Sequence, residues 1–212
     1  MQKNIVLWDV LCYAIIPLIV WNMLREYIGD YYAMLLSTVP GILYSFYRFY
    51  LVKKVNLFGM FLLGSLIIGT LVDVLAGSAM QMLWNNVYYA YAMAAFYLLT
   101  ILVNRPIFLY FSLDLVELQG ADRKEMKKIF YQKKILFIFK LVTFGFALRS
   151  IGLALIKTWL IQRYGVEAFD QALIARQVFS WGMTGIAMLG FVYISKLIKD
   201  QQQEKETAQA EG

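Results

Sequence analysis

Six apolar runs separated by polar segments dominate the sequence. They cover residues 4–24, 31–47, 56–76, 86–103, 135–156 and 178–197. A helix needs about 20 predominantly apolar residues to cross a hydrocarbon core that is roughly 30 Å thick. The pattern therefore predicts an all-α, polytopic transmembrane bundle of six helices within residues 1–198. No cleavage site follows the first run, so we expect an uncleaved span rather than a signal peptide.

The composition narrows the class further. Of the 212 residues 61% are hydrophobic and 16% charged, whereas soluble domains have about 45–50% and 25%. With no His and one Cys, the chain lacks the means for a His-based metal site, an imidazole base or an internal disulfide. It also lacks phosphate-binding, dinucleotide-binding and nucleophile-elbow motifs. We therefore expect no enzymatic activity, catalytic residue, metal or cofactor.

The distribution of Lys and Arg predicts the orientation in the membrane. If the N-terminus lies inside, 14 of these residues fall in inner segments and four in outer ones, namely Arg25, Lys157, Arg163 and Arg176. Cytoplasmic loops carry the excess of basic residues in membrane proteins. Both termini should thus be cytoplasmic, and we expect residues 199–212 to form a disordered polar tail.

The longest inner loop, residues 104–134, has an apolar half and a basic half. Its first half, Pro106 to Leu118, favours an amphipathic helix lying in the cytoplasmic membrane surface, with Asp114 and Glu117 on its wet face. Six basic residues follow, and each would attract anionic lipid headgroups by about 1 kcal/mol: Arg123, Lys124, Lys127, Lys128, Lys133 and Lys134. Membrane topology explains these charges, so we do not expect nucleic-acid binding.

Four ionisable residues interrupt the apolar runs: Asp9, Asp73, Lys140 and Arg149. A charge at mid-bilayer costs roughly 2.5–3.5 kcal/mol on insertion scales and is tolerated where it faces protein or water. The helical rise of about 1.5 Å per residue places Asp9 level with Lys140 and Asp73 near the level of Arg149. We predict two ion pairs on this basis. A functional polar cavity and snorkelling to the interface are the alternatives.

Other residues predict how the spans bend and pack. Pro17 and Pro40 should kink their helices, because each removes a backbone hydrogen bond in mid-span. Gly182 and Gly185 are among several small residues expected at helix contacts. Trp21 is expected in an aromatic belt at the outer interface. Residues 158–177 form the main outer connector, in which the spacing of Ala168, Ala172, Leu173 and Ala175 favours a short amphipathic helix leading into the sixth span.

Several segments together resemble a known family. They are LWDVLCYAIIPLIVWNML, LLSTVPGILYSFYR, NRPIFLYF and KLVTFGFALRSIGLALI. They resemble a family of uncharacterised bacterial six-span inner-membrane proteins. More distantly, they are similar to the intracellular septation protein A family, which shares the six-span plan and an R-P-[LI] element after its fourth span. The matching positions are Asp9, Pro17, Pro40, Arg105, Pro106 and Arg149; Asp73 and Lys140 lie outside the resemblance.

The resemblance implies a bacterial inner-membrane location and a role in cell division or envelope maintenance. The first functional hypothesis is thus a non-enzymatic protein that acts through lipid contacts, self-association, or contacts with envelope and division proteins. The alternative is a small transporter, or the substrate-binding membrane subunit of one, because buried charges in a six-span bundle suit a substrate path. The sequence leaves both open.

Overall fold

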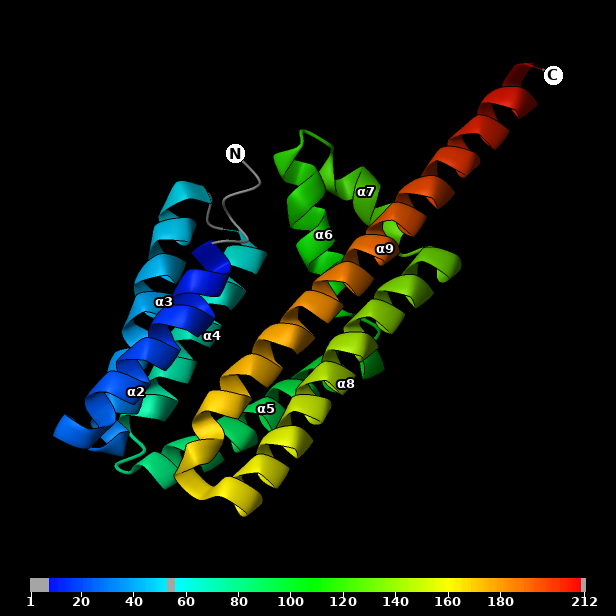
Figure 1. The fold of residues 1–212 in the computed structure, drawn as a ribbon. Helices are drawn as coiled ribbons and strands as arrows, with labels where there is room; N and C mark the ends of the chain where they lie inside the picture. The colour runs from blue at the N-terminus through cyan, green and yellow to red at the C-terminus, as the bar shows by residue number, and fades with distance from the viewer. Residues whose placement is uncertain (1–7, 53–55, 211–212) are drawn as a thin grey trace. The chain divides into compact units, whose positions relative to one another are not determined.

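The computed structural model describes residues 8–52 and 56–210, and they form helices joined by short turns (Figure 1). No strand occurs in these two ranges, which confirms the predicted all-α class. The elements in chain order are the π-helix η1 (Leu11–Ile15), α2 (Ile16–Ile28), α3 (Asp30–Val52), α4 (Leu57–Val74), α5 (Ala79–Leu102), α6 (Ile107–Leu118), α7 (Arg123–Phe130), α8 (Lys133–Tyr164), the 3-10 helix η2 (Gly165–Glu167) and α9 (Ala168–Ala210).

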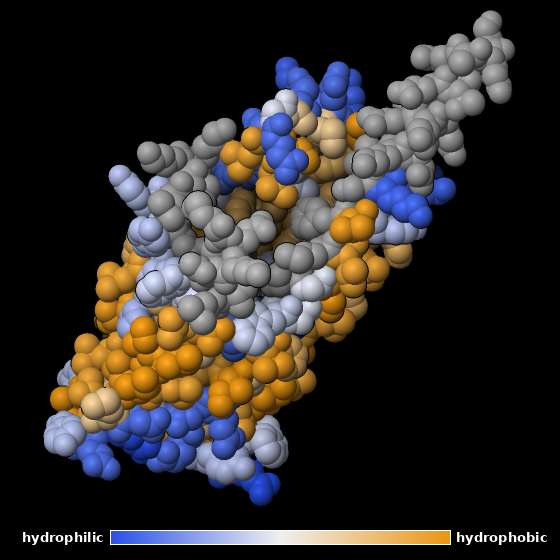
Figure 2. Space-filling view, turned by 45° about the horizontal axis from the view of Figure 1, so that its top comes forward, coloured by the Kyte–Doolittle hydropathy of each residue, from blue (hydrophilic) through white to orange (hydrophobic). Residues whose placement is uncertain are grey.

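Within the described ranges, three helical segments are long and apolar enough to cross a membrane: Trp8–Ile28, Leu57–Val74 and Lys133–Met183. The pair α5 and α6 would be a fourth if it forms one broken span, because the two helices are bent by 81° at the break between them. Helix α4 is the most exposed candidate, with only 6% of its residues buried. Hydrophobic side chains cover much of the face shown in Figure 2. This exposure is typical of helices that meet lipid.

The chain divides into two compact units. The first comprises the chain up to Ala94 together with Arg149–Ser180, and the second comprises Ala95–Leu148 and the chain from Trp181. Helices α8 and α9 each contribute residues to both units.

The core of the first unit forms around Trp21. Its side chain is fully buried, and its ring packs 5.1 Å from that of Phe169. Ala168 and Ala172, at the start of α9, join the same core, so the outer connector is helical as predicted and continues directly into α9. The guanidinium of Arg25 lies 4.6 Å from the centre of the Trp21 ring. The expectation of an interfacial Trp21 is therefore wrong, because α9 covers it.

The π-helix η1 and helix α3 approach each other closely at Gly41. A Cβ atom there would lie 3.0 Å from Cδ1 of Tyr13, whose hydroxyl is 2.6 Å from Oγ of Ser45. Pro17 lies in the first turn of α2, where its missing N–H is tolerated, directly after the π-helical turn η1. Helix α3 continues without a break through Pro40. The predicted kinks at these two prolines stay predictions.

The second unit has its own core, which consists of Leu109, Leu113, Phe130, Ile135, Phe139 and Ile194. Gly190 of α9 lies close to α8, since a Cβ atom there would be 2.9 Å from Cγ2 of Val142. A Cβ atom on Gly182 or Gly185 would meet nothing within 4 Å. The expected contacts at those two glycines are therefore wrong. Small residues allow helices to approach closely, but which glycine lies at a contact depends on the rotation of α9 about its own axis.

The end of α9 also differs from expectation. The helix runs to Ala210, so residues 199–210, expected to be disordered, are helical, while residues 211 and 212 lie outside the described range. This segment is rich in Gln, Glu, Lys and Ala, which have high helix propensity. Disorder was expected because apolar residues do not recur there at helical spacing. The segment nevertheless contains no Gly or Pro that would break a helix.

Candidate functional site

Helix α5 ends in an elbow formed by Asn104, Arg105 and Pro106. Asn104 has a left-handed backbone (φ 57°), which Asn tolerates better than most residues. The N–H of Asn104 donates to the carbonyl of Ile101 (3.0 Å), and that of Arg105 donates to the carbonyl of Thr100 (2.9 Å). These two hydrogen bonds end the helix in a Schellman motif. Pro106, which is buried, then turns the chain into α6.

An open cavity of about 480 Å³ lies at this elbow. We call it the elbow pocket, and its lining residues all belong to the second unit: Val103, Asn104, Arg105, Tyr110, Lys127 and Tyr131. They come from the end of α5, from α6, from α7 and from the turn after α7. The pocket thus gathers two cations, two phenols and an amide from residues up to 28 positions apart in sequence.

The two phenols of the elbow pocket interact directly. The hydroxyl oxygens of Tyr110 and Tyr131 are 3.1 Å apart. Burial and the hydrogen bond with Tyr110 raise the pKa of Tyr131 to about 12, although the nearby charge of Arg105 opposes this. Tyr131 therefore stays protonated at neutral pH and keeps its hydrogen for donation.

Lys140 connects the elbow to α8. Its ammonium donates a hydrogen bond to Oδ1 of Asn104. Because this oxygen is the acceptor of the amide, the other end, Nδ2, offers hydrogen-bond donors only. The predicted pair of Lys140 with Asp9 involves residues of different units and stays a prediction.

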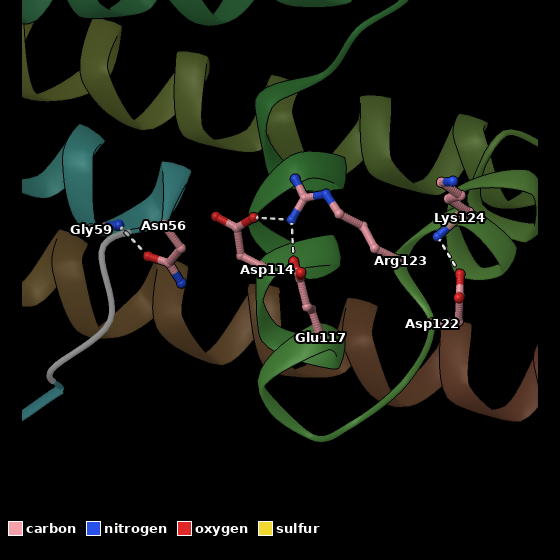
Figure 3. A network of polar contacts seen from close by, with 7 residues as sticks. All are labelled: Asn56, Gly59, Asp114, Glu117, Asp122, Arg123 and Lys124. Atoms are coloured by element: carbon pink, nitrogen blue, oxygen red, sulfur yellow. Dashed lines mark hydrogen bonds and ion pairs between the residues drawn. The ribbon is translucent and has the colours of Figure 1, made fainter.

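Arg123, at the start of α7, binds two carboxylates of α6 (Figure 3). Its Nη1 donates to Oδ1 of Asp114 and to Oε2 of Glu117, each at 2.6 Å. The hydrogen bond to Asp114, followed by that to Glu117, raises the pKa of Arg123 above its ordinary value, so it is charged at any physiological pH. The side chain of Asp114 is only 2% exposed, whereas that of Glu117 is 52% exposed. The expected wet position of Asp114 is therefore wrong.

The remaining predicted lipid-contact residues are exposed. Lys124, Lys127 and Lys128 lie along α7, and Lys133 and Lys134 begin α8. Asp122 caps α7 by accepting hydrogen bonds through its Oδ1 from the backbone N–H groups of Lys124 and Glu125. The cap leaves the ammonium groups of α7 outside the capping bonds. Of the six basic residues, Arg123 is thus engaged within the protein and five lie at the surface.

A second polar cluster occurs in the first unit, at the end of α4. Asn86 donates a hydrogen bond to Oδ1 of Asp73 (2.7 Å), and the hydroxyl of Tyr31 donates to the carbonyl of Val74 (2.7 Å). Lys157 and Arg176 lie close enough to Asp73 to attract its carboxylate. The cluster therefore draws on α3, α4, α5, α8 and α9.

Arg149 extends this cluster, because its charge acts on Lys157. The hydrogen bond described for the Asp73 side chain goes to Asn86, and the predicted Asp73–Arg149 ion pair stays a prediction. In the described ranges, no three His, Cys, Asp or Glu side chains gather in a way that could hold a metal ion.

No family model matches the chain, and no curated protein or solved structure matches it either. The resemblance to bacterial inner-membrane and septation families therefore stays a prediction. The structure does give the Arg105–Pro106 element a physical role at the elbow pocket. Asn104, Tyr110 and Tyr131, which line the same pocket, were not singled out from the sequence. The Asn-Arg-Pro triplet was the available signal for Asn104, since it combines a left-handed cap with a helix stop.

Proposed function

We propose that this chain is a bacterial inner-membrane protein with six spans, cytoplasmic termini and no catalytic activity, which acts through lipid and protein contacts. The exposure of α4 is the observation that carries the proposal. Its exposed side chains include Phe58, Met60, Leu62, Ile67, Ile68 and Leu71. Exposing so many apolar side chains to water is unfavourable, so a helix of this kind is stable where lipid or another protein covers it. The excess of Lys and Arg in the predicted inner segments favours an orientation with both termini in the cytoplasm.

The six-span arrangement assigns one span each to Trp8–Ile28, α3, α4, α5, α8 and α9. Helix α3 has 23 residues, which gives it a length of about 35 Å, enough for the hydrocarbon core. Its five Tyr residues, with Asp30 and Arg48, lower its hydropathy. Tyr residues are nevertheless favoured at membrane interfaces. Helix α6 then lies at the inner surface beside α7, with Leu115 and Leu118 exposed next to the lysines.

The biological role follows from the resemblance and from the chemistry of the surface. Envelope maintenance or cell division is the role that the septation-type resemblance implies. A protein of this kind needs no catalytic machinery, and anionic headgroups suit the five exposed lysines of α7 and α8. Partners would be a second copy of the chain or other envelope and division proteins.

Single-cysteine labelling tests the topology. In a Cys12→Ser background, Gln162→Cys places a thiol in the predicted outer segment and Gln119→Cys places one in the predicted inner loop; both positions are exposed. A membrane-impermeant maleimide should label position 162 in intact cells and position 119 only after lysis. Labelling of both positions in intact cells, or of neither before lysis, would contradict the arrangement.

Native mass spectrometry after gentle detergent extraction tests the mode of action. We expect retained phospholipid and, from cells, co-purified envelope proteins. A stoichiometric water-soluble molecule held by the chain would instead favour the second candidate function, a small transporter or its substrate-binding subunit.

The cluster around Asp73 is the observation that favours this second candidate. Three cations, Arg149, Lys157 and Arg176, are electrostatically coupled in a group with one carboxylate. A net positive group beside a candidate span suits an anionic substrate. If the chain is a transporter, Asp73→Asn should change the uptake of that substrate without lowering the amount of protein in the membrane. Glu26→Gln, which removes an exposed carboxylate of α2 outside this cluster, is the control.

A further inference from the structure

The elbow pocket presents hydrogen-bond donors and positive charge. Arg105 and Lys127 supply two full charges, and the amide of Asn104, whose oxygen already accepts from Lys140, has only donors left. Among the lining residues that the structure describes, none is Asp or Glu. A cavity with this lining suits an oxyanion, which accepts hydrogen bonds and carries negative charge.

The tyrosine pair adds a donor to the same cavity. Two hydroxyl groups that share one hydrogen bond place one hydrogen between their oxygens, and the second hydrogen remains available. The raised pKa of Tyr131 keeps its phenol protonated at neutral pH. The pair can therefore donate to an anion that sits between Arg105 and Lys127.

Two carboxylates of the same segment are already bound by a cation that does not line the pocket. Asp114 and Glu117 are both bound by Arg123, which lies outside the lining residues. The carbonyl end of α5 opposes anion binding, because a helix C-terminus carries about half a negative charge. The positive charges of Arg105 and Lys127 outweigh this partial negative charge. Two of the α5 carbonyls also already accept the hydrogen bonds of the Schellman motif.

Apolar surface adjoins the pocket on α5. Val103 lines the cavity, and Leu102 and Leu99 nearby on α5 are also exposed. A charged cavity with an apolar flank fits an amphiphile whose phosphate lies in the cavity and whose acyl chains lie along α5. Inorganic phosphate would use the cavity but not the flank.

We propose that the elbow pocket binds the phosphate group of an anionic membrane lipid, with Arg105, Lys127 and the Tyr110–Tyr131 pair as its ligands. The inference rests on the proposed function, since the pocket meets lipid headgroups only if α5 ends at the inner membrane surface. It adds a defined site to the general attraction of the lysines for anionic lipid. A phosphomonoester headgroup, which carries the most negative charge, is the preferred occupant.

Native mass spectrometry of the full chain tests this site. The detergent-solubilised protein is mixed with equal amounts of phosphatidic acid, phosphatidylglycerol and phosphatidylcholine of identical acyl chains. We expect the wild-type protein to retain them in that order. Lys127→Gln should lower the retained phosphatidic acid by about tenfold, the equivalent of one charge-assisted hydrogen bond. Tyr131→Phe, which keeps the ring and removes one hydroxyl, should lower it by a smaller factor.

Lys128→Gln is the matched control, because it removes the same charge from the adjacent position of α7 and Lys128 does not line the pocket. It should leave the order of lipids and the retained amount unchanged within about twofold. Equal losses in Lys127→Gln and Lys128→Gln would overturn the pocket, while the general lipid contact of the proposed function would stand. Failure of the labelling experiment would instead overturn the proposed function itself.

Inorganic phosphate distinguishes the two sources of the anion. If lipid is the occupant, excess phosphate leaves the retained phosphatidic acid unchanged, as expected from the apolar flank. If the wild-type protein binds inorganic phosphate in a Lys127-dependent way but retains phosphatidic acid no better than Lys127→Gln does, the oxyanion site stands and its assignment to lipid is overturned. Circular dichroism of each variant confirms that the helices are retained, and Lys127 is exposed, so its replacement should not disturb folding.

Discussion

Replacing Arg123 should loosen the packing of α6 against the second unit. Arg123→Gln removes the cation that binds Asp114, whose side chain is 2% exposed, and Glu117, whose side chain is 52% exposed. The buried carboxylate of Asp114 then loses the charge of Arg123, which makes local opening of α6 toward water less unfavourable. The exposed carboxylate of Glu117 loses little, because water already solvates it.

The expected cost follows from the exposure of the partners. Breaking a buried ion pair by removing one partner costs about 3–5 kcal/mol, whereas an exposed pair contributes about 0.2–1 kcal/mol. The side chain of Arg123 is 39% exposed and that of Asp114 is buried, so we expect an intermediate loss of about 2 kcal/mol. Glu117→Gln should cost less than about 1 kcal/mol.

Hydrogen exchange of the α6 amides measures this local stability directly. A loss of about 2 kcal/mol corresponds to roughly thirtyfold faster exchange. Glu117→Gln, the control on the same helix, should accelerate exchange by less than about fivefold. Asp114→Asn combined with Arg123→Gln should recover most of the protection, because no charge is then left buried. The reasoning is refuted if Arg123→Gln accelerates exchange no more than Glu117→Gln does.

Three further predictions concern backbone geometry and close packing. Gly190→Leu should lower the melting temperature in detergent, since its Cβ already meets α8 at 2.9 Å and overpacking costs about 1–3 kcal/mol; Gly185→Leu, which faces open space, should not. Asn104→Ala should be less stable than Asn104→Gly by about 1 kcal/mol, because both lose the same side-chain hydrogen bond but only Ala resists the left-handed backbone. Gly41→Leu should be destabilising, and Tyr13→Ala in the same chain should restore part of the loss by removing the ring that the new side chain meets; equal melting temperatures for the single and double variants would contradict this contact.

The sequence predicted the helices well, because apolar runs and helix stops are local signals. Each of the six runs overlaps one helical segment, in chain order Trp8–Ile28, α3, α4, α5, α8 and α9, although α9 extends well beyond its run at both ends. The start of α5 at Ala79 was missed by seven residues, since Ser78 and the residues after it are more polar than a typical span. A helix cap needs no apolar residues, and Oγ of Ser78 accepts from the backbone N–H of Gln81.

The misplaced residues were those whose environment depends on packing between distant segments. Trp21 is buried because Phe169, nearly 150 positions later, packs on it. Asp114 is buried because Arg123 lies on the next helix and reaches back over α6. Neither the preference of Trp for membrane interfaces, which was applied to Trp21, nor the spacing along α6, which was applied to Asp114, reports these distant partners. The candidate site was hidden for the same reason, since Tyr110 and Tyr131 meet only after α6 and α7 have folded together.

The elbow at Asn104–Pro106 also sets a length. A helix running uninterrupted from Ala79 to Leu118 would be about 60 Å long, twice the thickness of a hydrocarbon core of roughly 30 Å. The Asn-Arg-Pro triplet divides that length at Leu102 and leaves α5, at 24 residues, a piece that matches one bilayer crossing. If α5 crosses the membrane as proposed, these three residues determine where that crossing ends. Without them, the apolar residues of α6 would continue α5 as one long helix instead of joining Phe130 and Phe139 in the core of the second unit.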